Sequence, residues 1–251
     1  MSLKSGLMSR YKSKLIILTL ALFSGAVCGN VPEKQRNWNA NLYGGFTMKN
    51  GNTDEDSFRY GGVFEYKNET LYRCMTRFDG RYRKTNDKRS EAKNEAAAEL
   101  RRLITEKWFA SATMNVQHDD MRDIRYRIQG GPGVGHYFFD TKELGLDIST
   151  GVVYFHEKRE LESENSVDWR IAHRLTWKIT ENLDCWFNSE FLQNLDESRD
   201  FRMTVRAGIN NKINRHFSLT LTMLNEYDND PDSDDIEKND FELSAGIRYT
   251  F

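Results

Sequence analysis

The sequence predicts an all-β fold, a transmembrane antiparallel β-barrel of about twelve strands. Three observations predict it: an export segment at the start, alternation of apolar and polar residues along nearly all of the remaining chain, and a last strand that ends on Phe251 in phase with its apolar face. Alternation with period two is typical of strands. Because a soluble barrel also alternates, the export segment and the chain end favour the membrane barrel, with its apolar face outward.

The export segment places Lys12 and Lys14 before an unbroken apolar run at residues 15–23. This run is shorter than the roughly 20 residues of an ordinary membrane-spanning helix, and it is followed by small residues, as in a signal peptide. We therefore expect a cleaved signal peptide at 1–28, a short periplasmic segment at 29–36 and one barrel domain at 37–251. Lipidation of Cys28 is the alternative, which the bulky Val27 disfavours.

Composition excludes two classes of protein. The mean hydropathy of −0.73 and 29% charged residues would fit a disordered chain, but aromatic residues reach 12%, which argues against disorder. Without the four bases of residues 1–28, 32 of the 36 basic residues remain against 38 acidic ones. The resulting net charge near −6 points to neither nucleic acid nor anionic lipid as an electrostatic partner.

The alternation is clear from the first predicted strand onward. Between Trp38 and Met48 the even positions are apolar or small, whereas the odd positions are mostly polar. The strands predicted in this way are 37–49, 57–68, 70–83, 91–104, 107–118, 124–139, 143–157, 167–179, 183–195, 200–211, 215–227 and 240–251. An even number places both ends of the barrel on the periplasmic side.

Turn sequences repeat along the chain. Similar stretches begin at Ile104, Ile179 and Ile213, with a looser copy at Asp140, and each continues as turn, amphipathic strand and acidic loop. Longer charged loops are expected at 84–90, 158–166 and 228–238. This combination predicts short periplasmic turns at one end of the barrel and longer extracellular loops at the other.

Two segments depart from a simple strand pattern. Residues 94–103 are rich in helix formers, but their even positions are mostly apolar and their odd positions charged, so we predict a strand with Arg102 near the periplasmic rim. The stretch Gly130–Gly135 contains Pro132, which lacks a backbone donor, and it predicts a β-bulge.

If the apolar face contacts lipid, the other face makes the lumen densely charged and of mixed sign. Such a lumen is compatible with a narrow pore for small polar solutes or with a plug of arginine–carboxylate networks. The charged residues expected to line it are Arg73, Arg77, Arg81, Glu95, Glu99, Arg101, Arg125, Arg127, Arg170, Arg174, Asp184, Glu190, Arg202, Arg206 and Arg248.

After removal of residues 1–28, two cysteines remain, Cys74 and Cys185, both on the predicted outward face. Two small apolar side chains facing lipid are the favoured interpretation. A disulfide formed in an oxidising compartment is the alternative.

The last strand carries a pattern used in assembly. Leu243, Ile247, Tyr249 and Phe251 share its apolar face, and a terminal aromatic residue in this phase resembles the signal that the outer-membrane assembly machinery recognises. We expect this strand to direct insertion by that machinery.

The chain as a whole resembles the salt-induced outer membrane proteins, a Gram-negative family of unknown function. The similar features are the opening 38–45, the turns at Thr105 and Thr180, the glycine stretch 130–137 and the closing 246–251. The resemblance implies a barrel in the outer membrane, in contact with its lipid and lipopolysaccharide, and it implies no catalytic residues.

The sequence indicates no cofactor and no metal site. The acidic loop 228–237 lacks the glycine and glutamate spacing of a calcium loop, so a solvated loop is favoured over one that bridges cations to lipopolysaccharide. We expect a non-enzymatic protein, either a pore or a protein of envelope integrity under osmotic stress. The alternative is a barrel hydrolase that uses His216 and Ser218.

Overall fold

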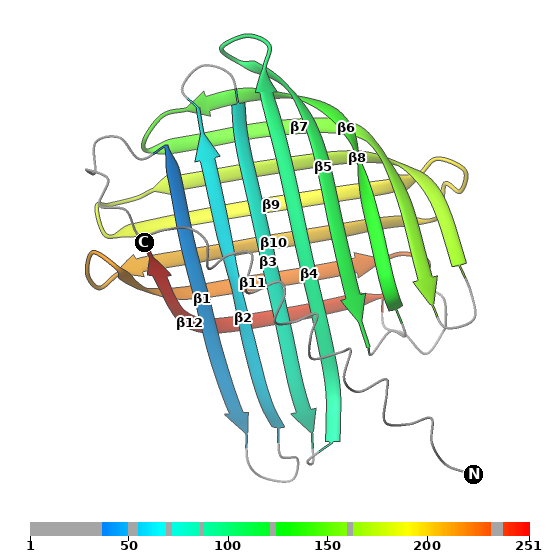
Figure 1. Ribbon diagram of the computed structural model, residues 1–251, viewed down its shortest axis with the longest axis horizontal. Coiled ribbons are helices and arrows are strands. Elements are labelled where there is room, and N and C mark those ends of the chain that lie inside the picture. The colour runs from blue at the N-terminus through cyan, green and yellow to red at the C-terminus, as the bar shows by residue number, and fades with distance from the viewer. Residues whose placement is uncertain are drawn as a thin grey trace, which may run out of the picture. The chain divides into compact units, whose positions relative to one another are not determined.

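The computed structural model describes residues 37–49, 55–68, 72–85, 88–120, 124–159, 163–231 and 238–251, and the predicted signal peptide and residues 29–36 lie outside them. Twelve strands make up the fold (Figure 1). They are β1 (Trp38–Lys49), β2 (Glu55–Lys67), β3 (Tyr72–Thr85), β4 (Lys88–Leu103), β5 (Trp108–Asp119), β6 (Ile124–Asp140), β7 (Leu144–Arg159), β8 (Ser163–Lys178), β9 (Leu183–Asn194), β10 (Phe201–Lys212), β11 (Phe217–Asp228) and β12 (Asn239–Thr250).

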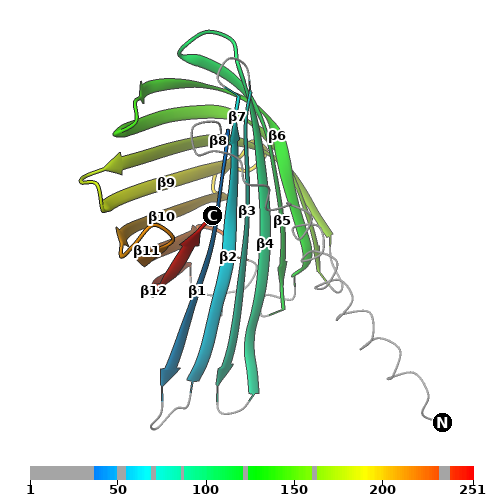
Figure 2. The same cartoon turned by 60° about the vertical axis from the view of Figure 1, so that its left-hand side comes forward.

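The strands form one closed antiparallel sheet. Each strand pairs with its neighbours in sequence, and β1 also pairs with β12, which closes the barrel. Two views of the barrel show the strands wrapping around one interior (Figures 1 and 2). The predicted twelve-stranded barrel is therefore confirmed.

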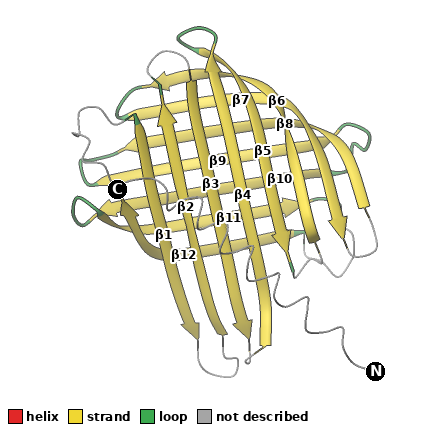
Figure 3. Ribbon diagram, in the orientation of Figure 1, coloured by secondary structure: helices red, strands yellow, loops and turns green. Residues whose placement is uncertain are grey.

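The described residues form strands and loops without a helix (Figure 3). Among them, accordingly, no helix has the length and apolar character needed to cross a membrane. The segment rich in helix formers is strand β4, as its alternation predicted. The exposed Arg102 lies 6.0 Å from the ring of Tyr72 in a cation–π contact near the end of the barrel where β4 meets β5.

Four of the tight turns at one end of the barrel are fully described, and they explain the repeats in the sequence. In three of them a threonine hydroxyl accepts a hydrogen bond from the backbone N–H three residues later: Thr105 from Trp108 at 3.0 Å, Thr141 from Leu144 at 2.9 Å and Thr180 from Leu183 at 3.0 Å. In the fourth, the Asn214 side chain does the same for Phe217 at 2.9 Å. Such side chain to backbone bonds stabilise tight turns, and we call this end the short-turn end.

Burial in the strands is inverted relative to a water-soluble barrel. Buried side chains include Glu95, Glu99, Arg101 and Asp168, whereas large apolar side chains are exposed. The exposed apolar set includes Leu42, Phe46, Leu100, Met114, Tyr154, Leu219, Leu221, Leu243 and Ile247. Because an apolar outer wall around a charged interior is stable only where the wall contacts lipid, the orientation of the two faces agrees with the prediction of a membrane barrel.

Two of the predicted charged loops are shorter than expected. Only residues 86–87 separate β3 from β4, and only 160–162 separate β7 from β8, because the paired strands continue into segments that were predicted as loops. Backbone pairing needs no apolar side chains, so the ladder extends beyond the apolar band. The longest connection, 229–238 between β11 and β12, agrees with the prediction.

The glycine stretch in β6 contains no register shift, so the predicted bulge is not there. Gly130 pairs with Tyr154 and Gly133 with Gly151 in one continuous register. The glycines instead allow β6 and β7 to approach closely. A Cβ atom on Gly131 would clash with the carbonyl oxygen of Val152, and one on Gly151 would clash with that of Pro132.

The seam between β1 and β12 is much shorter than the other contacts between strands. Four residue pairs, from Asn41–Thr250 to Gly44–Ile247, make up its ladder, whereas β1 pairs with β2 along its whole length. In Figure 1, β1 runs steeply while β12 runs almost horizontally, so the two strands diverge away from the short-turn end.

The four predicted assembly residues lie on the outward side of β12 and at the chain end. Leu243, Ile247 and Phe251 are exposed, and Tyr249 makes edge contacts with Phe217 and Phe251. The two remaining cysteines are free. Since Cys74 is on β3 and Cys185 on β9, six places apart in the ring of strands, the structure excludes the alternative of a disulfide between them.

Candidate functional site: the charged lumen

Nearly all of the charged residues expected in the lumen occupy inward positions on their strands. These residues are buried or half-buried, with one exception discussed below. The set is Arg73, Arg77, Arg81, Glu95, Glu99, Arg101, Arg127, Arg170, Arg174, Asp184, Glu190, Arg202, Arg206 and Arg248.

Arg125 is the exception, because it is exposed. Between β6 and β7 the register shifts so that Ile124 faces Arg159 and Tyr126 faces Lys158. Arg125 is thus the extra residue of a β-bulge, and the buried Ile124 takes an inward position instead. The expectation that Arg125 lines the lumen is corrected by this bulge.

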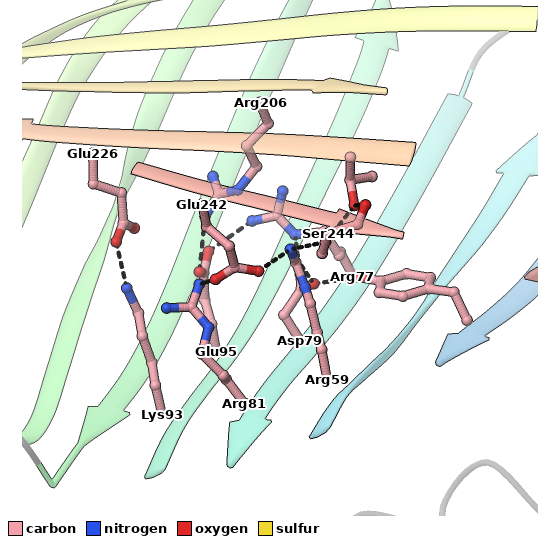
Figure 4. A network of polar contacts seen from close by, with 12 residues as sticks. Arg59, Arg77, Asp79, Arg81, Lys93, Glu95, Arg206, Glu226, Glu242 and Ser244 are labelled. Atoms are coloured by element: carbon pink, nitrogen blue, oxygen red, sulfur yellow. Dashed lines mark hydrogen bonds and ion pairs between the residues drawn. The ribbon is translucent and has the colours of Figure 1, made fainter. Parts of the chain in front are cut away.

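One ion-pair network spans the middle of the lumen (Figure 4). The carboxylate of Glu95 on β4 accepts hydrogen bonds from Arg77 on β3 at 2.6 Å and from Arg206 on β10 at 2.9 Å. Since β4 and β10 stand six places apart in the ring of twelve strands, the Glu95–Arg206 pair joins opposite walls. Asn115 donates a further bond to Glu95 at 2.8 Å.

The same network continues to the β1–β12 seam. Arg59 on β2 reaches past β1 and donates hydrogen bonds to Glu242 at 2.8 Å and to Ser244 at 3.1 Å, both on β12. Arg81 also pairs with Glu242. These contacts join β2 and β3 to β12 beyond the point where the backbone ladder of the seam ends (Figure 4). Ion pairs therefore hold a seam that has few backbone bonds.

A second cluster lies nearer the short-turn end, and Arg101 is at its centre. The guanidinium of Arg101 donates to Glu99 at 2.9 Å and to Asp147 at 2.9 Å, and it lies 4.3 Å from the ring centroid of Phe109. Arg174 on β8 donates to the other oxygen of Glu99 at 2.6 Å. We call Glu99, Arg101, Asp147 and Arg174 the ionic neck.

A third cluster lies toward the opposite end. Arg127 and Arg159 both donate to the buried Glu157 at 2.5 Å, and Arg202 donates to the buried Asp168 at 2.6 Å. The Arg202 guanidinium also lies 4.0 Å from the ring centroid of the buried Phe155. The free-energy cost of burying these carboxylates is offset because each of them pairs with an arginine.

Two cavities flank the ionic neck. One of about 130 Å³ lies in the middle of the barrel, between Arg77, Arg170 and Arg206. The other, of about 240 Å³, is lined by Lys67, Arg73 and other residues toward the short-turn end. Both cavities are lined by Glu99, Arg101, Asp147 and Arg174, so the ionic neck separates them. Each is large enough for several water molecules.

The sequence prediction omitted several inward residues that complete these networks. They occupy the same alternating positions as the predicted residues, so the period-two pattern could have identified them. They are Arg59, Asp79, Lys93, Asp147, Glu157, Asp168, Glu226 and Glu242.

The geometry does not assemble the predicted hydrolase pair. His216 lies in the turn before β11, where its ring stacks on Tyr249 and its Nδ1 lies 3.0 Å from the carbonyl oxygen of Thr250. Ser218 is buried on the inward row. Within the described residues, no group of three histidine, cysteine or acidic side chains is arranged to hold a metal ion. Residues 232–237 of the acidic loop lie outside the described chain.

Comparison with known proteins places the chain in a family. Residues 44–251 match the family described as "Protein of unknown function, DUF481". The chain belongs to this family. Its description does not include the salt-induced name, which stays a prediction. A search of curated proteins gives no match.

Solved structures with a similar fold are outer-membrane barrels. The NanC porin has 10% sequence identity and a TM-score of 0.50, with 85% of this chain and 98% of that chain covered. The KdgM porin has 6% identity and a TM-score of 0.47, with 85% and 99% covered. The translocator domain of the autotransporter NalP from Neisseria meningitidis has 10% identity and a TM-score of 0.46, with 97% and 98% covered. At such identity, the likeness to the NanC porin is one of fold.

Proposed function

We propose that the protein is an outer-membrane pore of low conductance for small polar solutes, with a lumen that ion pairs narrow at the ionic neck and at Glu95. The observation that carries the proposal is the pair of cavities, each lined in part by charged side chains, that meet at the neck. Space for water beside charged side chains is what the passage of a small polar solute requires. Polar linings and charged constrictions are the means by which pores select solutes.

The surroundings of the barrel belong to the same proposal. The exposed apolar belt fits a bilayer, and residues 1–28 have the composition of an export signal. Together they support export to a Gram-negative outer membrane and contact there with lipid and lipopolysaccharide. Insertion would depend on the assembly machinery reading Leu243, Ile247, Tyr249 and Phe251.

The ion pairs across the lumen favour a second candidate function. Glu95–Arg206 at 2.9 Å and Lys93–Glu226 at 2.7 Å tie distant strands together, as a structural plug would. In this case the protein would support envelope integrity under osmotic change and would pass no solute.

Solute flux into liposomes separates the two candidates. The refolded protein, residues 29–251, is inserted into liposomes, and swelling is followed with glycine, a pentose and a disaccharide. A pore narrowed by side chains predicts entry of the smallest solute at a rate that falls steeply with size. Equal impermeability of liposomes with and without the protein would contradict the pore and support the plug. Ala97→Leu, which places a larger side chain in the 130 Å³ cavity, should reduce the flux, whereas Ala112→Leu on the exposed face of β5 should not.

A further inference from the structure

The cavity of about 130 Å³ owes its existence to small side chains between charged rows. On β4 the inward positions on either side of Ala97 are Glu95 and Glu99, and on β8 those on either side of Ala172 are Arg170 and Arg174. Glu99 and Arg174 bond to each other at 2.6 Å, so Ala97 and Ala172, each two residues farther from the short-turn end, lie at one level of the barrel. Their small side chains leave space next to the ionic neck. This level is the only one on β4 between Lys93 and Arg101 where the inward residue is uncharged.

The charged atoms that line this space are predominantly cationic. Five arginines line the cavity against three carboxylates, which are Glu99, Asp147 and Glu190. The arginines are Arg77, Arg101, Arg170, Arg174 and Arg206. Two partner carboxylates, Glu95 and Asp79, lie behind Arg77 and Arg206 and do not line the cavity. The shell as a whole is balanced in charge, but the surface that a solute meets carries two more positive than negative groups.

The exposed fraction of the side chain also differs between the two partners of each ion pair. The Arg174 side chain is 29% exposed and its partner Glu99 7%, while Arg206 is 18% exposed and its partner Glu95 7%. Arg170 and Glu190 show the reverse, 14% against 28%. Arg174, Arg206 and Arg77, which is 21% exposed, are thus more accessible from the lumen than the carboxylates that they pair with, whereas Arg170 and Arg101 are not. Planar guanidinium forks are the side chains best suited to bind carboxylate and phosphate groups.

We infer that this cavity is a binding site for a compact oxyanion, a phosphate or a small dicarboxylate, which would enter from the lumen and be held by Arg77, Arg174 and Arg206. The inference rests on the proposed function in one respect, since solute must reach the lumen. A volume of about 130 Å³ is below the roughly 300–1,000 Å³ of pockets for drug-sized ligands, so the site admits an anion of few heavy atoms. Asn115, Gln129 and Thr204 supply further polar groups in the lining.

Two variants remove a cavity arginine without leaving a carboxylate unpaired. In Arg174→Gln, Glu99 retains Arg101 at 2.9 Å, and in Arg206→Gln, Glu95 retains Arg77 at 2.6 Å. The matched control is Arg59→Gln, an inward arginine that lines neither cavity and whose partner Glu242 retains Arg81. All three lose one positive charge, so a general charge effect would be equal among them.

Isothermal titration calorimetry of the refolded protein in detergent, at fixed ionic strength, tests the site with inorganic phosphate and, separately, with succinate. We expect saturable binding of at least one of them to a single site, weakened about tenfold or more in Arg174→Gln and in Arg206→Gln, because a hydrogen bond between charged groups is lost, and within about twofold of wild type in Arg59→Gln. Binding of phosphate alone or of succinate alone identifies the oxyanion.

Absence of saturable binding by both anions, or equal weakening in Arg59→Gln, would overturn the site. The outcome is independent of the flux assay. Binding without flux would refute the proposed pore and leave the site, whereas flux of neutral solutes without anion binding would refute the site and leave the pore.

Discussion

Glu95 on β4 and Arg206 on β10 form an ion pair of 2.9 Å across the full width of the barrel. No backbone ladder connects these strands, which have five others between them on either side. The pair is one of several long-range contacts, with Lys93–Glu226 and Arg174–Glu99, that make the interior a connected network. The stability of the barrel and the width of its lumen therefore depend on the same side chains.

Loss of the Glu95 carboxylate should strongly destabilise the barrel. In Glu95→Ala, Arg206 loses its salt bridge to the Glu95 carboxylate, and Arg77 keeps its salt bridge to Asp79. Removal of one partner from a buried ion pair costs about 3–5 kcal/mol, and because Glu95 is only 7% exposed, we expect a loss of unfolding free energy of this order. Urea unfolding in detergent micelles measures it. Glu106→Ala, in the exposed turn between β4 and β5, should cost under about 0.5 kcal/mol, and an equal loss in both variants would contradict the account.

A methyl group at Gly135 should disturb the aromatic contact beside the ionic neck. A Cβ atom there would clash with the ring of Phe109, whereas one on Gly44 would have its nearest neighbour at 3.8 Å. Phe109 is fully buried and packs against Tyr137 at 4.6 Å. Overpacking of this kind costs about 1–3 kcal/mol, so Gly135→Ala should lower the thermal midpoint for loss of the compact, heat-modifiable gel species. Gly44→Ala should leave it nearly unchanged.

The seam should be the part of the barrel that opens most readily. Beyond Gly44–Ile247, the described residues of β1 and β12 form no backbone ladder, and Arg59 on β2 reaches across to Glu242 on β12. Amide hydrogen exchange should therefore be faster in 45–49 and 239–246 than in the long β7–β8 ladder. Glu242→Gln should accelerate exchange at the seam and leave exchange in β7 unchanged. Equal protection of β1–β12 and β7–β8 would show that the seam closes fully in a membrane.

The terminal residue should matter for assembly and not for lumen chemistry. Phe251 is exposed and packs against Tyr249 at 4.9 Å, on the side of the barrel that we assign to lipid. In cells, Phe251→Ser should reduce the fraction of protein that reaches the folded, heat-modifiable form. Thr250→Ser, a small change at the adjacent position of opposite phase, should not. Normal assembly of Phe251→Ser would contradict a role of Phe251 in the recognition of the last strand during assembly.

The sequence predicted the barrel because alternation repeats in every strand, and it predicted the turns because Thr105, Thr141 and Thr180 form the same hydrogen bond. It misplaced Arg125 because one extra residue in a bulge reverses the phase of alternation locally. Bulges depend on pairing with the neighbouring strand, which the alternation within one strand does not contain.

The sequence pattern also could not predict which side chains pair across the lumen. Alternation identifies Glu95 and Arg206 as inward, but which inward residues meet depends on the tilt and stagger of the strands around the ring. The cavity of about 130 Å³ likewise arises from Ala97 and Ala172 lying at one level on different strands. These relationships are set by tertiary geometry and become visible only in the assembled barrel.

Single-channel recording in planar bilayers, with wild type beside the double variant Glu95→Ala/Arg206→Ala, tests the central claim most directly. The account predicts small, discrete conductance steps for wild type and larger steps for the double variant, because the ion pair that joins opposite walls is removed. Arg125→Ala, on the exposed bulge, should conduct as wild type. Folded barrels that remain electrically silent in all three forms would contradict the pore and leave a salt-bridged structural protein.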